Sequence, residues 1–332
     1  MQFDQMRRRE LLTLLSGAAA AWPLAANAQA PQVPVIGFLS SASPRAFATL
    51  LAAFHQGLSE QGYVEGRNVF VADRWAEGHY DDLEKLANDL VQRQVKLIAA
   101  TGGAVTAKAA MKATTTIPIL FVVGTDPVEL GLVTSLSRPS GNATGATVFT
   151  TELAPKRLQL LSALGSGNRT TAILVNPASP TADIEINDAM AAAQKIGLQL
   201  LVVKASNENE IGPAFVSATR QQVGALLVSA DPLFTARRDQ VVALAARHAL
   251  PVMYPWREFV EAGGLMSYGT ELTWGYHLIG QYAGRILKGA KPSDLPVELP
   301  TRFRLVINSK TAKALRLDMP PQLLALVDEE IE

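Results

Sequence analysis

Residues able to hold a small polar ligand follow the predicted strands of this 332-residue chain at regular intervals. They supply hydroxyls, glycine backbone amides, side-chain amides and carboxylates, in the segments Ser40-Ser41, Thr101-Gly102-Gly103, Thr125-Asp126-Pro127, Asn176-Pro177 and Asp231-Pro232. Several of these segments lead directly into a helix, whose free N–H groups and positive dipole end attract a carboxylate. We therefore expect Ser40, Ser41 and Thr101 to hold a ligand carboxylate. Asp126 or Asp231 is expected to hold an ammonium group.

Each of these segments also has a purely structural interpretation. Ser, Thr, Asp and Asn are frequent helix caps that stabilise a helix by about 1 kcal/mol each. The Asp-Pro and Asn-Pro pairs also suit turns. A binding site is therefore predicted from the convergence of several loops and not from any one of them.

Aromatic residues make up 6% of the chain, and some of them also follow strands. They are Phe38, Trp75, Phe234, Tyr254-Pro255-Trp256 and Tyr268. Packing in the core or at its rim explains most such positions. Tyr268 is the best candidate for stacking on a ligand ring, because a strand is expected to end there at a hinge.

Several kinds of reactive site are missing from the sequence. There is no G-x-S-x-G nucleophile elbow, no G-x-x-x-x-G-K-[ST] phosphate loop and no G-x-G-x-x-G fingerprint. Cysteine is absent, which excludes thiol catalysis, disulfides and Cys-type zinc sites. The four histidines, His55, His79, His248 and His277, lack the spacing of metal ligands. We therefore predict no metal and no cofactor, and the balance of 30 basic and 30 acidic residues argues against a nucleic-acid partner.

Alternating strands and helices are expected to position these loops. In the first half, apolar runs over 33–39, 68–73, 97–100, 119–123 and 142–147 predict strands. Helices are predicted over 47–61, over 81–93 and from the residue after Gly103 through Thr114. The pattern recurs with strands over 171–175, 199–203, 225–228 and 252–254 and helices over 181–196, 212–222 and 237–248. This alternation predicts parallel sheets with helices on both faces. In such sheets, ligands bind beyond the carboxyl ends of the strands.

The C-terminal third predicts that the chain crosses between two lobes more than once. It contains a strand over 265–268, a long helix over 272–288, extended segments over 295–300 and 303–307, and a short helix over 309–315. This tail is too small for a third domain, so we expect it to return to the first lobe and cross again. The predicted lobes are residues 31–148 plus about 270–296, and residues 151–268 plus about 301–332, with a ligand cleft at the hinge.

Residues 1–28 are predicted to be an export signal peptide. Arg7-Arg8-Arg9 precedes a run of small and apolar residues, and Ala26-Asn27-Ala28 forms a small-residue cleavage site. Arg8-Arg9 followed by leucines also resembles a twin-arginine signal, with the general secretory route as the alternative. The apolar run is too short to span roughly 30 Å of hydrocarbon. We therefore expect a cleaved signal and a soluble, monomeric periplasmic protein.

Several stretches together resemble one known family. They are Val35-Ile36-Gly37-Phe38-Leu39-Ser40-Ser41, Gly62-Tyr63-Val64-Glu65-Gly66-Arg67-Asn68, Trp75-Ala76-Glu77-Gly78, Asp126-Pro127-Val128, Arg138–Gly145 and Leu174-Val175-Asn176-Pro177. Over nearly the whole chain after the signal, the sequence resembles the ABC transporter substrate-binding proteins of the tryptophan/tyrosine-uptake type. The resemblance implies a type I periplasmic-binding fold, in which two doubly wound parallel-sheet lobes joined by a three-segment hinge close on a small ligand.

The resemblance also implies a receptor without catalysis, which delivers its ligand to an inner-membrane ABC permease with a cytoplasmic ATPase. It implies a pocket built from both lobes, with Ser40, Ser41, Thr101, Gly102, Gly103, Thr125, Asp126, Asn176, Asp231 and Tyr268 as candidates. The ligand stays open between an aromatic amino acid, an aromatic acid and another small carboxylate. Two alternatives are a secreted hydrolase or racemase that uses Asp126 and Asp231, and a sugar-repressor-like sensor domain.

Overall fold

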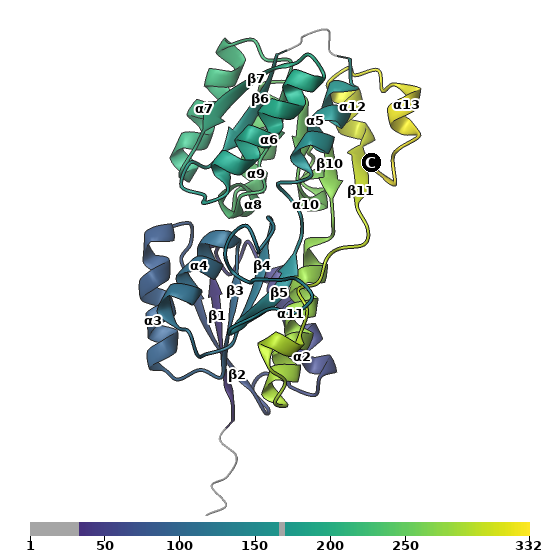
Figure 1. The fold of residues 1–332 in the computed structure, drawn as a ribbon. Helices are drawn as coiled ribbons and strands as arrows, with labels where there is room; N and C mark the ends of the chain where they lie inside the picture. The colour runs from purple at the N-terminus through teal and green to yellow at the C-terminus, as the bar shows by residue number, and fades with distance from the viewer. Residues whose placement is uncertain (1–32, 166–169) are drawn as a thin grey trace, which may run out of the picture. The chain divides into compact units, whose positions relative to one another are not determined.

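The computed structural model describes residues 33–165 and 170–332, which contain two α/β lobes (Figure 1). The predicted signal peptide, residues 1–28, lies outside the described residues. Among the residues that are described, no helix combines the length and the apolar character needed to cross a bilayer.

Lobe 1 is built on a parallel sheet of five strands in the order β2-β1-β3-β4-β5. The strands are β1 (Val35–Ser40), β2 (Phe70–Trp75), β3 (Leu97–Thr101), β4 (Ile119–Val123) and β5 (Ala143–Thr147). Helices α2 (Ala48–Glu60) and α11 (Leu272–Leu287) cover one face, and α3 (Leu83–Gln92) and α4 (Ala104–Ala113) cover the other. On β4, Leu120 and Val122 pack toward the first pair of helices and Phe121 toward the second. Burial on both faces explains why the central strands β3 and β4 are nearly continuous apolar runs.

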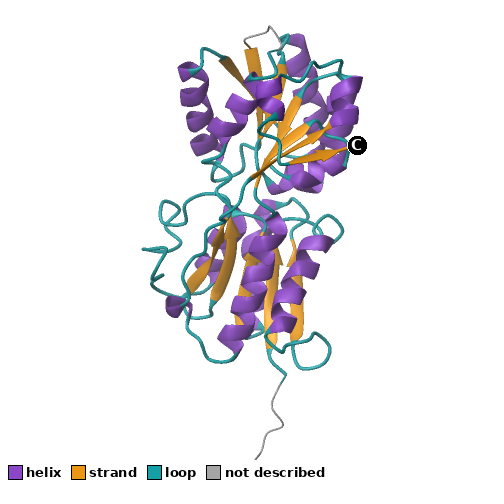
Figure 2. Ribbon diagram, turned by 90° about the vertical axis from the view of Figure 1, so that its right-hand side faces the viewer, coloured by secondary structure: helices purple, strands orange, loops and turns teal. Residues whose placement is uncertain are grey.

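Lobe 2 is built on a sheet of seven strands in the order β12-β11-β10-β9-β8-β6-β7. The strands are β6 (Thr170–Val175), β7 (Gln199–Lys204), β8 (Ala225–Val228), β9 (Val252–Tyr254), β10 (Met266–Gly269), β11 (Arg304–Asn308) and β12 (Glu329–Ile331). Helices α7 (Glu208–Arg220) and α9 (Arg238–Arg247) pack on one face, and α5 (Ala154–Ser162) and α6 (Ala182–Lys195) on the other. Figure 2 shows helices on both faces of this sheet. The prediction of two doubly wound parallel sheets is confirmed.

Strands β11 and β12 run opposite to the rest of this sheet, because β11 pairs antiparallel with β10 and β12 pairs parallel with β11. The chain leaves lobe 2 at the carboxyl end of β10, forms α11 on lobe 1, and comes back to lobe 2 as β11. A strand that re-enters a sheet at the end where its neighbour left must run in the opposite direction. The antiparallel pair is therefore a direct consequence of the excursion to lobe 1.

Helix α11 is held on lobe 1 by close backbone contact with α2, although more than 200 residues separate the two helices in the sequence. They lie side by side in Figure 1. A Cβ atom on Gly57 would overlap the carbonyl oxygen of His277, and one on Gly280 would overlap that of Phe54. Glycine is required at these positions because the approaching atoms belong to backbone, which has no room to move aside.

Several elements differ from the sequence expectation. Helix α7 begins at Glu208, four residues before the predicted start, because Asn207 caps it by accepting a hydrogen bond from the N–H of Asn209 at 3.1 Å. The predicted extended segment 295–300 forms one bridge, between Glu298 and Ala146, and no strand. Four short elements were not predicted: α5, β12, α8 (Pro232–Ala236) and α13 (Pro321–Leu324). The remaining short elements are the helices α10 (Arg257–Glu261) and α12 (Ser309–Ala314) and the 3₁₀ turns η1 (Tyr80–Asp82) and η2 (Pro292–Asp294).

The contact between α2 and α11 predicts that Gly280→Ala destabilises the protein. Overpacking against backbone costs roughly 1–3 kcal/mol, more than the gain in helix propensity from alanine. Thermal unfolding followed by circular dichroism measures the effect as a lower Tm. Gly275→Ala is the matched control in the same helix, because its Cβ would meet side-chain methyls instead of backbone, the nearest being those of Val122 at 3.1 Å and Val148 at 3.7 Å. Equal melting temperatures for the two variants would contradict this account of the packing.

Candidate functional site

The loops after β1 and β3 meet at the carboxyl edge of the lobe 1 sheet. These strands are neighbours, and Ser40 lies opposite Thr101 in their register. The hydroxyl of Ser41 donates to the carbonyl of Gly102 at 2.7 Å, and that of Thr101 donates to the carbonyl of Leu39 at 3.3 Å. Both hydroxyls are therefore committed to the backbone, and the contact with Ser41 leaves no space for a Cβ at Gly102. The structure brings Ser40, Ser41, Thr101 and Gly102 together as a rigid, buried platform.

Gly103 carries this platform into helix α4. It is the N-cap residue of α4, with φ at +90°. Because its side chain is a single hydrogen, the helix N-terminus stays uncovered, and a Cβ here would lie 3.5 Å from the ring of Pro232 in lobe 2. The N-terminal end of α4 therefore faces the beginning of α8.

Thr125 and Asp126 lie in the turn after β4. The Thr125 hydroxyl hydrogen-bonds with that of Thr151 at 3.0 Å. The Asp126 carboxylate accepts from the N–H of Val128 at 2.8 Å, and its own N–H donates to the carboxylate of Glu152. Neither Thr125 nor Asp126 lines a cavity described below. The structure thus gives Asp126 the geometry of a turn cap.

Asn176 and Asp231 are brought together at the carboxyl edge of the lobe 2 sheet. The Asn176 amide donates to Oδ1 of Asp231 at 3.0 Å, and the N–H of Leu233 donates to the same oxygen at 2.9 Å, which caps α8. A third donor comes from lobe 1, since the hydroxyl of Tyr80 lies 2.8 Å from this oxygen. Tyr80 begins the 3₁₀ turn η1 (Tyr80–Asp82). One carboxylate oxygen therefore collects donors from both lobes.

The other oxygen of Asp231, Oδ2, is buried and has no hydrogen-bond partner among the described residues. Burial raises the pKa of the Asp231 carboxyl, although hydrogen bonding to Asn176, Leu233, Tyr80 and Ser179 lowers it. A buried acceptor without a donor costs roughly 1–3 kcal/mol. An incoming cationic donor, such as an ammonium group, would remove this cost.

Glu185 on α6 is a second buried carboxyl near this point. It is only 5% exposed, and burial raises its pKa to about 7, while the positive charge of Arg157 lowers it and the negative charge of Asp231 raises it further. Its Oε1 also lacks a partner among the described residues. Two buried acids that repel each other favour protonation of one of them at neutral pH.

The outer cavity has a volume of about 940 Å³ and is lined by residues of both lobes. Ser41 is the only predicted site residue that lines it, and Tyr80 lies at its wall. Charged side chains of both signs complete the lining, among them Arg45, Glu77, Asp81, Arg237 and Asp239. Its volume matches that of cavities that bind small molecules.

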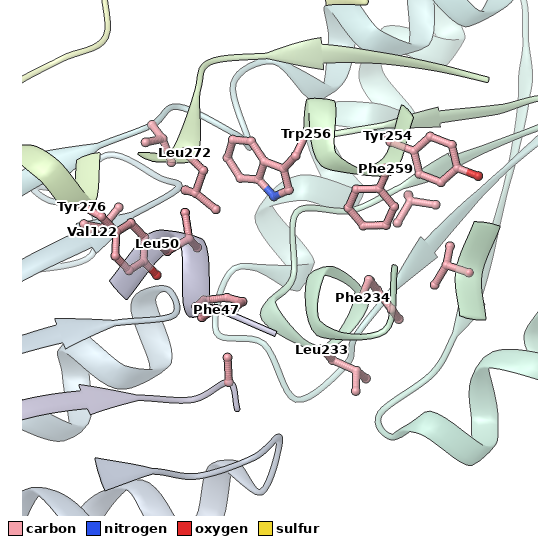
Figure 3. Close-up of a cluster of buried hydrophobic side chains, with 14 of the residues drawn as sticks. Phe47, Leu50, Val122, Leu233, Phe234, Tyr254, Trp256, Phe259, Leu272 and Tyr276 are labelled. Atoms are coloured by element: carbon pink, nitrogen blue, oxygen red, sulfur yellow. The ribbon is translucent and has the colours of Figure 1, made fainter. Parts of the chain in front are cut away.

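The inner pocket, about 50 Å³, is apolar and aromatic. Phe47, Tyr276 and Leu272 reach it from lobe 1, and Trp256 reaches it from lobe 2 (Figure 3). The rings of Phe47 and Tyr276 lie 6.2 Å apart, edge to face. Gly102 and Gly103 line the same pocket, and Pro232 lines both cavities. The pocket therefore adjoins both the platform and the residue after Asp231.

Tyr268 lies elsewhere. It lines neither cavity, and its ring sits 6.4 Å from that of Phe303. Its carbonyl oxygen accepts a hydrogen bond from Arg157 at 2.7 Å. Among the aromatic residues that the sequence analysis named after strands, Trp256 is the one that lines the inner pocket. The sequence analysis included Trp256 but preferred Tyr268 for stacking on a ligand ring.

Sequence reasoning also missed Tyr80, Phe47 and Tyr276. Tyr80 lies in the polar segment between β2 and α3, several residues beyond the end of the strand. Phe47 and Tyr276 lie beside or in helices, where an aromatic residue is typical of core packing. Three of the four histidines predicted to be structural lie away from both cavities: His55 pairs with Glu65, His277 with Glu60 and His248 with Thr219. His79, next to Tyr80, lines the outer cavity. Within residues 33–165 and 170–332, no cluster of His, Asp and Glu has the arrangement of a metal site.

These features define a two-lobed α/β binding protein with a polar cavity and an aromatic pocket at the carboxyl edges of its sheets. Residues 32–331 match the ABC transporter substrate binding protein family. The chain belongs to this family, as the resemblance predicted.

Individual relatives agree with this assignment. The chain is 27% identical to the tyrosine-binding protein of Clostridioides difficile strain R20291 over 262 residues, which cover 79% of this chain and 75% of the relative. It is 26% identical to the ABC domain from Streptococcus pneumonia whose crystal structure contains L-Trp, with a TM-score of 0.81 over 90% of this chain and 99% of that one. A conserved domain protein from Vibrio cholerae shares the fold, with a TM-score of 0.83 at 23% identity over 90% of this chain and 100% of that one.

The buried carboxyl of Glu185 predicts a pH-dependent stability. Because burial raises its pKa from 4.5 to about 7, the folded protein holds a proton that the unfolded chain has lost between these pH values. The free energy of unfolding therefore falls as pH rises through this window, by roughly 3 kcal/mol. Glu185→Gln removes this loss. The Tm of the variant minus the Tm of the wild type should therefore be more positive at pH 8 than at pH 5.

Exposed Glu129 provides the control, since Glu129→Gln should shift the Tm equally at both pH values. Parallel melting curves for Glu185→Gln and wild type across the two pH values would show that Glu185 does not take up a proton on folding.

Proposed function

We propose that this protein is the extracytoplasmic solute-binding receptor of an ABC importer. It captures a small ligand between its lobes and delivers it unchanged to a membrane permease with a cytoplasmic ATPase. Membership of the substrate-binding family supports the transport role. The observation that carries the ligand assignment is the unpartnered buried oxygen of Asp231, which lies next to an aromatic pocket.

We propose an amino acid with an aromatic side chain as the ligand. Its ammonium group would donate to Oδ2 of Asp231, and its ring would enter the pocket of Phe47, Trp256 and Tyr276. Its carboxylate would lie at the N-terminus of α4, where Gly103 leaves the backbone N–H groups uncovered and the helix dipole is positive. The names of two relatives, a tyrosine-binding protein and a domain bound to L-Trp, support this class.

Binding requires the lobes to move. The inner pocket, at about 50 Å³, is much smaller than typical ligand cavities of roughly 300–1,000 Å³. Asp231 is also covered, because Tyr80 of lobe 1 donates to it directly. We propose that the lobes open to admit the ligand and that contacts from both lobes then favour the closed form.

The rotating bodies in this proposal are residues 31–148 with about 270–296, and residues 151–268 with about 301–332. The predicted ligand contacts are divided between them. Ser40, Ser41, Thr101, Gly102, Gly103, Thr125 and Asp126 belong to the first body, and Asn176, Asp231 and Tyr268 to the second body or the hinge. Among these, the geometry supports the platform residues with Asn176 and Asp231 most strongly.

Asp231→Asn should weaken binding of L-tryptophan and L-tyrosine at least about tenfold, because it removes the charge that an ammonium group needs while keeping the shape of the side chain. Isothermal titration calorimetry measures the loss. Asp183→Asn on the exposed start of α6 is the control and should bind as the wild type does. Wild-type affinity in Asp231→Asn would exclude Asp231 as the ammonium site. Recovery of the ligand unchanged after incubation would separate a receptor from a hydrolase or racemase.

We also propose export by a cleaved N-terminal signal of the twin-arginine type. Replacing Arg8 and Arg9 together by lysine should abolish export through that route, since the pathway reads the arginine pair. Fractionation of cells that express the full chain measures the result. Normal accumulation of the double variant outside the cytoplasm would contradict the twin-arginine route and favour general secretion.

A further inference from the structure

Arg157 on α5 is the largest fully buried side chain among the described residues, with an exposure of 0%. Arginine is almost never fully buried unless it is paired. Within residues 33–165 and 170–332, Arg157 forms no salt bridge, and the charge of Glu185 acts on it from a greater distance. Desolvation lowers the pKa of Arg157 to about 10, so the guanidinium stays charged at neutral pH. Such a charge needs a structural or functional explanation.

The partners of Arg157 are the two segments where the chain passes between the lobes. Its Nη1 donates to the carbonyl of Thr150 at 2.8 Å, in the segment that joins β5 of lobe 1 to α5 of lobe 2. Its Nε donates to the carbonyl of Tyr268 at 2.7 Å, near the end of β10, where the chain leaves for α11. One planar group thus ties the first crossing to the start of the second.

Thr150 is held from the lobe 1 side as well. Its hydroxyl donates to the carbonyl of Gly124, after β4, at 3.1 Å, and the N–H of Thr151 donates to the same oxygen at 3.2 Å. The preceding residue, Phe149, has φ at +48°, a strained conformation for a residue with a side chain. Thr150 also lines the inner pocket. Thr150 therefore makes hydrogen bonds with residues of both lobes, next to the proposed position of the ligand.

The third nitrogen of Arg157, Nη2, packs against the second crossing. It has no hydrogen-bond partner among the described residues, and a Cβ on Gly269 would lie 3.4 Å from it. A Cβ there would also overlap the carbonyl oxygen of Pro255. Gly269 lets the backbone of the crossing approach the guanidinium closely, which keeps the two crossings together.

We propose that Arg157 is a positioning residue of the hinge. It fixes to each other the first two segments in which the chain passes between the lobes, so that the lobes rotate about one point. It also keeps Thr150 at its position in the inner pocket. Its effect on ligand affinity rests on the receptor function proposed above, whereas its effect on lobe motion does not. Lysine cannot replace it, because one ammonium lacks the planar, diverging N–H groups that reach two separate carbonyls.

The experiment measures the distance between the lobes directly. Because the chain has no cysteine, Lys85→Cys on α3 and Gln194→Cys on α6 attach one spin label to each lobe at exposed positions. Pulsed electron paramagnetic resonance then gives the distance distribution without ligand. In Arg157→Lys, we expect a distribution at least about twice as wide as in the wild type, and about tenfold weaker binding of L-tryptophan by calorimetry.

Arg74→Lys is the matched control. Arg74 pairs with Asp89 inside lobe 1, so its replacement should leave the distance distribution and the affinity unchanged. Thr150→Val is the second test variant, because it breaks the bond to Gly124 on the opposite side of the same junction and should also widen the distribution. If Arg157→Lys does not fold, the result for Thr150→Val tests the hinge role.

The outcomes separate the two proposals. If Arg157→Lys folds and has the wild-type width of the spin-label distance distribution and the wild-type affinity, the hinge role is wrong. If Arg157→Lys cannot be purified, an unchanged width in Thr150→Val would overturn the hinge role instead. If the wild type fails to bind L-tryptophan and L-tyrosine while Arg157→Lys still widens the distribution, the hinge role stands and the proposed ligand class fails.

Discussion

The close backbone contact between α2 and α11 determines the form of this protein. Glycines on both helices let the backbones approach to a distance at which no Cβ fits. This contact holds α11 on lobe 1, although the strand before it and the strand after it both belong to lobe 2. The chain must therefore pass between the lobes three times, and a hinge of several segments follows from the docking of one helix. Single-segment connections leave domains free to reorient, whereas several parallel segments restrict them to a hinge motion.

The hinge and the candidate site share a small group of buried polar side chains. Arg157, Glu185 and Asp231 are all almost completely buried, and each has one polar atom without a partner among the described residues. Interiors of low dielectric make such groups costly unless something offsets the cost. At Asp231 a ligand ammonium group would supply the missing donor, and at Glu185 a proton would remove the charge. Arg157 donates hydrogen bonds to backbone carbonyls of the segments that connect the lobes. The buried charges of the candidate site and the contacts of the proposed hinge therefore lie in the same region.

The elements of the fold were largely predictable because their signals are local. Strands such as Ile119–Val123 and Ala225–Val228 were predicted with their observed bounds, since burial on both sheet faces leaves uninterrupted apolar runs between turn residues. The missed elements are short or depend on distant partners. Strand β12 exists only because β11 pairs with it, and α8 begins where the Asp231 carboxylate caps it. The antiparallel direction of β11 depends on the path of the chain through lobe 1, which no local pattern contains.

The sequence by itself determined the alternation of strands and helices, the loops at the carboxyl edges, and the family. These follow from hydrophobic periodicity and turn residues, which act within a few positions of the chain. Tertiary structure alone decided which loop residues face a cavity. It made Asp126 a turn cap, gave Asp231 a donor from Tyr80, replaced Tyr268 by Trp256 at the aromatic pocket, and buried Arg157 between the crossings. The physical reason is that a side chain's role depends on which distant backbone or side-chain groups satisfy its polar atoms, and only the folded chain brings those groups together.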